Sequence, residues 1–315
     1  MRLGRTVAAA GALCAMLLAA GCGTDDGGGK TGTAGTANGP SGVSTTPSAP
    51  PQIAPYLARS GVDLSASPTW AKARDRGHLI VGAKDDQPFL GYEDPATLRR
   101  SGFDIEIARM VSAELGLDPE AVEFRTIASG SREAAIANGD VDMYVGTYSI
   151  TDKRKETVDF AGPYYISGQS LLVRRQEAAI TGKDTIRGKK VCAVKGSTAL
   201  LKLQTDFPET QALFYDSYST CVEHLLTGGV DAVSTDEAIL KGYAAKDPGH
   251  LKIVGQPFTT ENYGIGLPKG DRVLRNAVDD ALEARERDGT WRRAYDATLG
   301  LSGEPAPAVP AVRRD

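Results

Sequence analysis

Between residues 78 and 299, short apolar runs alternate with amphipathic stretches. The apolar runs predict buried strands, and the amphipathic stretches, whose apolar residues recur every three to four positions, predict helices. This alternation is typical of an α/β fold. The expected strands are 78–82, 122–126, 141–145, 189–194 and 230–234, and the expected helices are 102–116, 132–138, one that starts at 198, 219–227 and 236–245.

The plan of strands and helices occurs twice along the chain. Gly228-Gly-Val-Asp-Ala232, before one expected strand, is similar to Asn138-Gly-Asp-Val-Asp142, before another. A weak internal repeat of this kind predicts two similar lobes.

The two ends of the chain have a different composition. Residues 1–21 carry Arg2 and Arg5 before a short apolar run that ends in small residues, which is typical of an export signal. Residues 22–67 are rich in Gly, Thr, Ser, Pro and Ala, and residues 302–315 are similar. Such segments bury too little apolar surface to offset their ordering entropy, so we expect a flexible linker and a disordered tail.

Cys22 follows the apolar run directly, in Ala19-Ala-Gly-Cys22. This resembles a bacterial lipobox, in which the cysteine receives a diacylglyceryl group and becomes the mature N-terminus. Ala19 stands where leucine is usual, and simple secretion with an ordinary cut is the alternative. The lipobox interpretation makes residues 1–21 a lipoprotein signal peptide and predicts a protein anchored to the outer face of the cell membrane.

Charge and cysteine content exclude some classes of protein. The chain has 36 basic and 40 acidic residues, a net charge of −4, and loss of Arg2 and Arg5 with the leader gives −4 − 2 = −6. No nucleic-acid partner is expected, since such a partner needs a basic face. An oxidising compartment favours a disulfide between Cys192 and Cys221, with two separate buried thiols as the alternative. The histidines lack ligand spacing near these cysteines, so no metal and no cofactor are expected.

A hydroxyl-containing loop follows the expected strand 141–145. It reads Val145-Gly-Thr-Tyr-Ser149, and Arg154 comes five residues later. Ligands bind at the carboxyl edge of open α/β sheets, where loop N–H groups and an arginine fork match a carboxylate. Taken alone, a helix capped by Thr151 with Arg154 on a solvated face is the simpler interpretation.

Several short motifs along residues 78–299 resemble, in order and spacing, family 3 of the periplasmic solute-binding proteins for polar amino acids. Tyr218-Ser-Thr-Cys221 also resembles the actinobacterial glutamate-binding subgroup. Each motif is weak alone, but the set is specific. The motifs are Gly102-Phe-Asp-Ile-Glu106, Gly139-Asp-Val-Asp142, Thr151-Asp-Lys-Arg154, Phe160-Ala-Gly-Pro-Tyr-Tyr165, Val194-Lys-Gly-Ser-Thr198, Asp231-Ala-Val-Ser-Thr-Asp236 and Tyr263-Gly-Ile-Gly266.

The resemblance implies a two-lobe periplasmic-binding-protein fold of type II. Each lobe would be a mixed sheet flanked by helices, and the ligand would lie in the cleft between them. Lobe 1 would comprise 68–168 and 263–299, and lobe 2 would comprise 172–257. The two hinge crossings would lie near 169–171 and 261–264.

The resemblance also implies how the α-carboxylate of an amino acid is held. Arg154 would pair with it, helped by Ser149. The N–H groups of Ser197 and Thr198, at a helix start, would contribute from the other lobe, because helix N-termini favour anions. For Ser197 and Thr198, simple helix capping is the alternative.

The α-ammonium group would be held by acceptors from both lobes. Asp236 would contact it, together with the Thr147 carbonyl and the Ser149 hydroxyl. The alternative for Asp236 is a cap on the following helix. In many relatives Thr147 is a glycine, so its contact is the least secure of the three.

Preference for an acidic side chain would come from two cations. Lys84 and Arg132, the latter in Ser129-Gly-Ser-Arg132, match positions where glutamate and aspartate binders carry basic residues. An amide there would leave positive charge uncompensated in a dry site. Ordinary surface charges are the alternative. Ser129 lies in the same stretch, and Tyr148 and Phe89 are candidates for a ring against the ligand, with core packing as the alternative for Phe89.

The function implied is that of a monomeric, membrane-anchored binding protein that delivers glutamate, aspartate or glutamine to the permease subunits of an ABC importer. One alternative is a sensor that passes the ligand signal to a membrane kinase pathway. Another is an enzyme, since some relatives are cyclohexadienyl dehydratases. The sequence contains no Ser-His-Asp or Cys-His arrangement, so we expect no enzyme.

Overall fold

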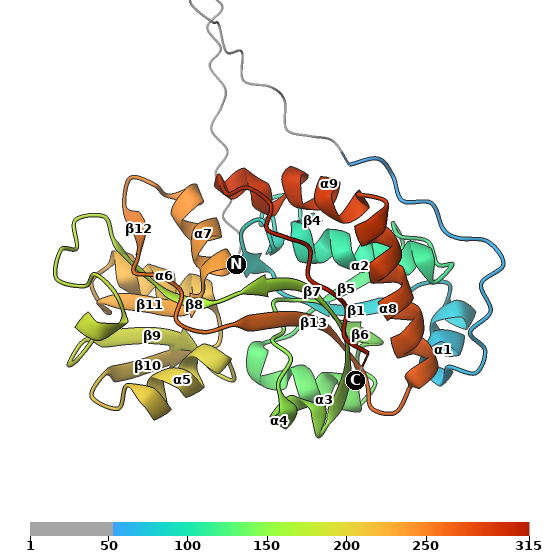
Figure 1. The fold of residues 1–315 in the computed structure, drawn as a ribbon, viewed down its shortest axis with the longest axis horizontal. Helices are drawn as coiled ribbons and strands as arrows, with labels where there is room; N and C mark the ends of the chain where they lie inside the picture. Colours follow the sequence, from blue (N-terminus) through green and yellow to red (C-terminus); the bar gives the residue numbers. More distant parts are fainter. Residues whose placement is uncertain (1–52, 315) are drawn as a thin grey trace, which may run out of the picture. The chain divides into compact units, whose positions relative to one another are not determined.

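The computed structural model describes residues 53–314, which belong to one compact unit (Figure 1). The expected signal peptide, Cys22 and the first part of the expected linker lie outside the described residues. Across residues 53–314, none of the helices has the length and apolar character needed to cross a bilayer.

Two five-stranded sheets form the cores of two lobes, as the repeat predicts (Figure 1). In lobe 1 the order is β5-β1-β6-β13-β7; β5 and β6 run parallel to β1, while β13 runs antiparallel to β6 and β7. In lobe 2 the order is β10-β9-β11-β8-β12. The strands are β1 (Ile80–Ala83), β5 (Glu123–Thr126), β6 (Met143–Tyr144), β7 (Val158–Ser167), β8 (Gln169–Arg174), β9 (Lys190–Val194), β10 (Gln211–Tyr215), β11 (Ala232–Asp236), β12 (Leu251–Val254) and β13 (Glu261–Pro268).

Helices cover both sheets. In lobe 1, α2, α8 and α9 pack together on one side of the sheet, and α3 and α4 lie on the other (Figure 1). A small sheet of β2 (Asp86–Gln87), β3 (Gly91–Glu93) and β4 (Arg100–Ser101) adjoins them. The helices of lobe 1 are α1 (Pro68–Arg76), α2 (Phe103–Glu114), α3 (Arg132–Ala137), α4 (Asp152–Lys155), α8 (Arg272–Arg287) and α9 (Thr290–Ala297), and those of lobe 2 are α5 (Thr198–Asp206), α6 (Tyr218–Leu226) and α7 (Glu237–Lys246).

The chain crosses between the lobes at two adjacent places. Gly168 separates β7 of lobe 1 from β8 of lobe 2, and the return crossing lies between β12 and β13. Both lie slightly before the crossings expected at 169–171 and 261–264. A Cβ at Gly168 would come within 2.4 Å of the Thr259 carbonyl oxygen, so only glycine lets the two crossings approach this closely.

The core of lobe 1 contains an aromatic cluster. Phe103, on α2, packs edge-on against Trp291 with ring centroids 5.4 Å apart, and it also contacts Tyr295 and Tyr164. The Trp291 Nε1 donates to the Tyr164 carbonyl oxygen at 2.8 Å, so the buried indole keeps its hydrogen bond. This cluster fixes α2 and α9 to the sheet that carries the site.

The folded part begins before residue 68, the boundary expected from composition. The Arg59 N–H donates to the Ala113 carbonyl oxygen at 2.8 Å, and Tyr56 packs against the core of lobe 1. Residues 53–67 are therefore not free linker, because a few apolar and backbone contacts hold them on the surface of α2.

The end of the chain also departs from the disordered tail expected at 302–315. Beyond the last helical turn, at Leu299–Ser302, Glu304 pairs with Lys241 of α7 at 3.4 Å. Farther on, the Arg313 N–H donates to the Gly162 carbonyl oxygen at 2.8 Å, and Arg314 pairs with Asp280 of α8 at 2.7 Å. The Pro- and Ala-rich composition does not reveal these contacts, which depend on single hydrogen bonds and ion pairs with distant residues.

A disulfide joins Cys192 and Cys221, as expected, with the Cα atoms 5.7 Å apart. It connects β9 to α6 inside lobe 2. The turn after β9 and the first turn of α6 both reach the cleft between the lobes, so the bond ties two lobe 2 elements that face lobe 1.

Candidate ligand-binding site

Polar side chains from both lobes line a cavity between the two sheets. Eight of the ten predicted ligand-binding residues lie here; Lys84 and Tyr148 do not line the cavity. Little free volume remains between the side chains. The lining residues are Ser129, Arg132, Thr147, Ser149 and Arg154 from lobe 1, and Ser197, Thr198, Tyr218, Thr235, Asp236 and Ile239 from lobe 2.

Arg154 enters the cavity from the short helix α4. Thr151 caps this helix by accepting a hydrogen bond from the Arg154 N–H at 3.3 Å, but the side chain is buried, at 9% exposure, rather than solvated. Its guanidinium donates to the Ser149 carbonyl oxygen at 2.6 Å and pairs with Glu133 at 3.3 Å. It also donates across the cleft to the Gly196 carbonyl oxygen at 3.0 Å.

Arg132 lies beside Arg154 and begins helix α3. Its Nε donates to the Ser129 carbonyl oxygen at 2.9 Å, and its other end donates to the Gly196 carbonyl oxygen at 3.2 Å. No carboxylate of residues 53–314 pairs with it within 4.0 Å. Burial, followed by the like charge of Arg132, lowers the pKa of Arg154 to about 10, so Arg154 stays positive at neutral pH.

Tyr148, proposed from sequence as a ring against the ligand, lies beneath the two arginines. The guanidinium carbon of Arg132 is 4.3 Å from its ring centroid and that of Arg154 is 4.9 Å away. The ring itself is buried in a cluster with Tyr144 and Phe160. Tyr148 thus supports the two cations through cation–π contacts instead of lining the cavity.

The lobes meet most closely at Gly196, in the turn between β9 and α5. Its φ is +78°, and a Cβ there would come within 2.6 Å of the Gly130 Cα in the other lobe. The Gly196 carbonyl oxygen accepts from both arginines, so it uses donors that a ligand carboxylate would need. A carboxylate that binds Arg132 and Arg154 would therefore compete with this carbonyl for their N–H groups.

Replacing Gly196 with alanine is expected to shift the protein toward an open arrangement, because the added methyl would overlap Gly130. Overpacking of this kind costs about 1–3 kcal/mol, so ligand affinity should fall about tenfold and the radius of gyration should rise. Small-angle scattering and calorimetry measure both quantities.

Two variants separate this effect from backbone strain. Gly188→Ala places alanine at a similar φ of +71° with no atom within 4 Å, and Gly130→Ala meets its nearest atom at 3.6 Å. Both should bind as the wild type does. If Gly188→Ala lost as much affinity as Gly196→Ala, the overlap at the cleft would not be the cause.

Asp236 supplies a carboxylate from lobe 2. It directly precedes α7, but its side chain makes no capping hydrogen bond, so the capping alternative does not describe it. One oxygen accepts from the Tyr263 hydroxyl at 2.7 Å, and the other is buried without a hydrogen-bond partner among the described residues. Burial, followed by the charge of Glu261, raises the pKa of Asp236 to about 7. A cation in the cavity would satisfy the unbonded oxygen.

Thr147 has a left-handed backbone, with φ of +45°. This conformation favours glycine, which is the residue expected here in many relatives. Its N–H donates to the buried Asp104 carboxylate at 3.1 Å, and its hydroxyl donates to Gln87 at 3.2 Å. Tyr164 donates to the other Asp104 oxygen at 2.7 Å, so a network from α2 and β7 holds the loop in place.

The start of α5 forms the lobe 2 side of the cavity. The Ser197 hydroxyl accepts from the Leu200 N–H at 3.0 Å, so this side chain caps the helix, as the alternative stated. The Thr198 hydroxyl donates to Glu261 in lobe 1 at 3.0 Å. The Ser197 N–H donates to the Val194 carbonyl oxygen at 3.1 Å. Of the two backbone N–H groups expected to contact the anion, only that of Thr198 is therefore left among the described residues.

Lys84 lies behind the cavity, directly after β1. It is 3% exposed, and its amine has no hydrogen bond or ion pair with another described residue. Burial lowers the pKa of this lysine, opposed by the nearby charge of Asp86. Phe89, the second candidate ring, lies under the Lys246 amine of α7 at 5.3 Å and does not line the cavity.

Three residues that line the cavity were not predicted. The Thr235 hydroxyl donates to the Tyr218 hydroxyl at 2.6 Å, and Ile239 projects from α7. Tyr218 and Thr235 both belong to motifs that indicate the family, and this membership was the signal in the sequence that could have identified them as site residues. Their hydrogen bond joins α6 to β11 and is not visible from either motif alone.

A second contact between the lobes lies at the N-terminus of α6. The Asp86 carboxylate, from lobe 1, accepts from the Tyr218 N–H at 2.7 Å and from the Ser219 N–H at 3.1 Å. The Tyr243 hydroxyl of α7 donates to the Asp86 carbonyl oxygen. The carboxylate thus completes the hydrogen bonding of a helix start in the opposite lobe.

The two sheets with paired crossings, and the polar cavity between them, define a two-lobe binding protein of the type II periplasmic fold. The described residues contain no group of three or more His, Cys, Asp or Glu side chains placed to hold a metal ion. A family profile described as "Bacterial extracellular solute-binding proteins, family 3" matches residues 79–300, and the chain belongs to this family. The resemblance found in the sequence is thereby confirmed.

Individual relatives agree with this assignment. The glutamate-binding protein GluB of Corynebacterium glutamicum is 41% identical over 76% of this chain and 84% of the relative. The ABC transporter glutamine-binding protein GlnH of Bacillus subtilis is 34% identical over 73% of this chain and 84% of the relative. A crystal structure of an ancestral amino acid-binding protein, described as a precursor of cyclohexadienyl dehydratase, has a TM-score of 0.67 and 28% identity, covering 73% of this chain and 99% of that one.

Proposed function

We propose that this protein binds L-glutamate in the cleft and presents it to the permease subunits of an ABC importer. The choice of glutamate as the ligand rests on the charges of the site. Two buried cations of lobe 1, Arg132 and Arg154, line the cavity, and a buried lysine, Lys84, lies behind it. Lobe 2 contributes one buried carboxylate, Asp236, with an unbonded oxygen. The identity to a glutamate-binding relative supports the same ligand.

Each charged group of glutamate has a partner in this arrangement. The α-carboxylate would replace the Gly196 carbonyl at Arg154, because a guanidinium fork binds a carboxylate through two parallel hydrogen bonds. The α-ammonium would satisfy the unbonded oxygen of Asp236. The side-chain carboxylate would lie toward Arg132 and Lys84, the two cations that lack a carboxylate partner among the described residues.

Charge balance separates glutamate from glutamine. Glutamine carries no side-chain charge, so it would leave Arg132 and Lys84 uncompensated in a closed and drier site. Burying uncompensated charge costs several kcal/mol, which favours the acid over the amide. Aspartate has the same charges on a shorter side chain, and weaker binding is expected because its carboxylate would reach these cations less well.

The ligand would act as the bridge between the lobes. Arg154 belongs to lobe 1 and Asp236 to lobe 2, so an amino acid bound to both gains more from the closed form than from the open one. Such differential affinity shifts the balance toward closure, and the closed form would be the one that the permease recognises. We further propose that lipid on Cys22 anchors a monomer to the outer face of the membrane.

The protein would bind its ligand without converting it. The enzyme alternative remains concrete, because a structural neighbour is described as a dehydratase precursor and a buried acid with a pKa near 7 could serve as a general acid. Turnover of prephenate in an absorbance assay would support the enzyme and contradict the binding function. A sensing role would use the same clamp. Glutamate uptake by cells that lack this protein separates the two roles, because only the transport role predicts that uptake is lost.

Calorimetry with a panel of amino acids tests the ligand. L-Glutamate should bind most tightly, aspartate less so, and glutamine should be at least tenfold weaker. In Arg132→Ala the ratio of glutamate to glutamine affinity should fall about tenfold, about 1.4 kcal/mol. Arg99→Ala, an exposed cation outside the cleft, should leave that ratio unchanged. Tightest binding of lysine or histidine would contradict the proposed roles of Lys84 and Arg132.

A further inference from the structure

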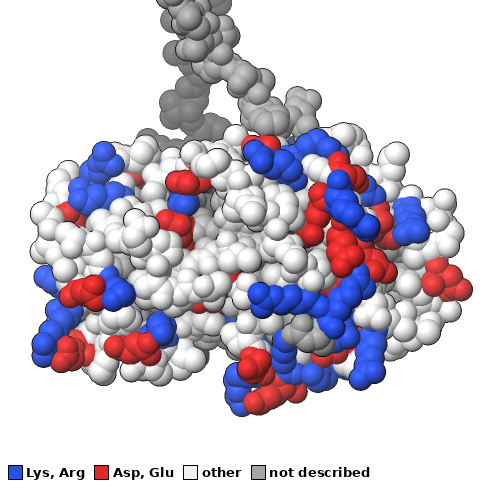
Figure 2. All heavy atoms as spheres, in the orientation of Figure 1, with Lys and Arg blue, Asp and Glu red and all other residues white. Residues whose placement is uncertain are grey.

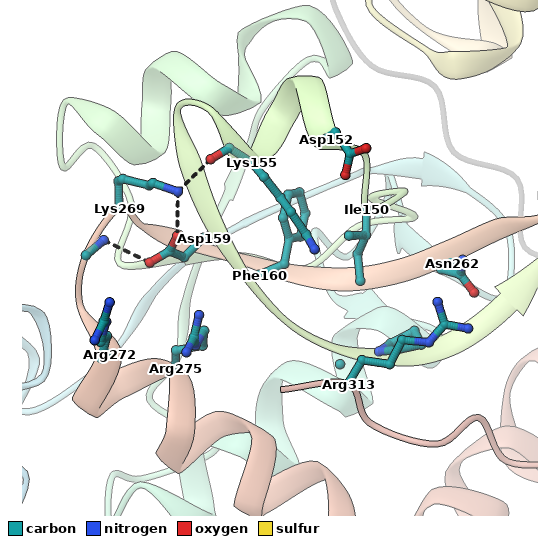
Figure 3. Close-up of a pocket in the computed structure, with 13 residues that line it drawn as sticks. Ile150, Asp152, Lys155, Asp159, Phe160, Asn262, Lys269, Arg272, Arg275 and Arg313 are labelled. Atoms are coloured by element: carbon teal, nitrogen blue, oxygen red, sulfur yellow. Dashed lines mark hydrogen bonds and ion pairs between the residues drawn. The ribbon is translucent and has the colours of Figure 1, made fainter. Parts of the chain in front are cut away.

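A second hollow lies on lobe 1, away from the amino acid site. It has a volume of about 670 Å³, within the range of small-ligand sites, and it is bounded by α4, β7, the start of α8 and the end of the chain (Figure 3). Five cations line it against two carboxylates, a net charge of 5 − 2 = +3. On the face drawn in Figure 2, Lys and Arg side chains gather over this part of lobe 1. The cations are Lys155, Lys269, Arg272, Arg275 and Arg313.

The two carboxylates do not neutralise this hollow. Asp159 is already paired with Lys269 at 3.0 Å and accepts from the Gly270 N–H at 2.8 Å (Figure 3). Asp152 is exposed at the rim. In contrast, the guanidinium groups of Arg272 and Arg313 make no hydrogen bond or ion pair with any residue described here. They come from α8 and from the final segment, so two forks from separate parts of the chain reach one hollow.

The floor of the hollow is apolar. Phe160 is buried, and Ile150 and Pro163 lie beside it. A cationic rim over an apolar floor suits an anion attached to an organic group, and arginine forks favour a tetrahedral phosphate with several acceptor oxygens. We propose that this hollow is a binding site for a phosphate ester, either the headgroup of an anionic phospholipid or a soluble organic phosphate.

The site would share a segment with the amino acid cleft. Lys155 faces the hollow while its neighbour Arg154 faces the cleft, both from the four residues of α4. In the same way, Ile150 lines the hollow while its neighbour Ser149 lines the cleft. The amino acid affinity therefore reports whether a variant keeps the fold of this shared segment.

The test compares two variants with the same net charge. Arg272→Ala with Arg313→Ala removes these two guanidinium groups from the hollow, whereas Arg99→Ala with Arg175→Ala removes two exposed cations elsewhere. In calorimetry at low salt, sn-glycerol 3-phosphate should bind the hollow variant at least tenfold more weakly than the wild type and the control variant. Glutamate affinity should be equal in all three.

Vesicle flotation distinguishes the two sources of phosphate, with Cys22→Ser in every protein so that no lipid anchor forms. If phosphatidylglycerol vesicles bind the wild type and the control but not the hollow variant, the ligand is a lipid headgroup. If only the soluble ester shows this difference, the ligand is a soluble phosphate. The proposal would be overturned if the hollow and control variants had the same affinity for sn-glycerol 3-phosphate and the same binding to the vesicles. This holds whatever the affinity for glutamate.

Discussion

Replacing Arg154 with alanine is expected to abolish binding of every amino acid that the protein takes. The α-carboxylate is common to all of them, and the Arg154 guanidinium lies in the cleft, where it donates to the Ser149 carbonyl oxygen and to the Gly196 carbonyl oxygen of the opposite lobe. Loss of one partner of a buried, hydrogen-bonded charge pair costs about 2–5 kcal/mol. Calorimetry should therefore show affinity falling by about two to three orders of magnitude for glutamate, aspartate and glutamine alike.

Two further variants identify the cause. Lys153→Ala removes a neighbouring cation on α4 that pairs with Glu156 on the surface, and it should bind normally. Arg154→Lys keeps the charge but loses the planar fork, so it should recover only part of the affinity. Near-normal affinity in Arg154→Ala would show that the carboxylate is held elsewhere.

Replacing Asp236 with asparagine is expected to make the protein more stable at neutral pH and unable to bind. In the folded protein its pKa is about 7, against an ordinary value of 3.8. The folded state therefore holds this proton more tightly than the unfolded state does. The proton on Asp236 contributes fully to the stability of the folded state below about pH 4. This contribution is lost as the pH rises through 7, because a buried charge then forms.

Asparagine stays neutral and can still accept from Tyr263, so it avoids that loss. The variant should unfold with a free energy higher by a few kcal/mol at pH 8 than the wild type, with little difference at pH 4. Denaturant titrations without amino acid at the two pH values measure this. A less stable variant at pH 8 would indicate that Asp236 has a structural role.

The same pKa sets the pH dependence of binding in the wild type. Only the ionised Asp236 attracts the ligand ammonium, and a proton competes for the same oxygen. Affinity should be constant above about pH 7 and fall about tenfold for each pH unit below it. The Asp236→Asn variant should lack this dependence, which calorimetry between pH 5 and pH 8 can measure.

The sequence predicted several elements of the fold closely, but β7 (Val158–Ser167), β13 (Glu261–Pro268) and α8 (Arg272–Arg287) were not among the expected elements. The helix expected at 102–116 is α2 at Phe103–Glu114, and the strand expected at 189–194 is β9 at Lys190–Val194. Hydrophobic periodicity reports burial directly, so it indicates elements such as these two. It cannot find β2 to β4, whose two or three residues contain no full period.

The residues of the site could be predicted where they lie in motifs. They could not be predicted where tertiary contacts determine the direction of a side chain or the conformation of the backbone. Arg154 and Asp236 line the cavity, as predicted. Tyr148 lies between Thr147 and Ser149, which also line it, but its ring turns into the core beneath the arginines. The left-handed Thr147 depends on Asp104, 43 positions away in the sequence. Neither the direction of a ring nor a bond over that distance is encoded in a local pattern.

The contact between Asp86 and the first turn of α6 joins a full charge to a helix dipole across the gap between the lobes. Attraction of this kind is screened by dissolved ions, with a Debye length of about 8 Å in physiological saline. Raising the ionic strength weakens one of the contacts that hold the lobes together but does not change the binding groups themselves. Apparent affinity will therefore decline with added salt even for a zwitterion of no net charge.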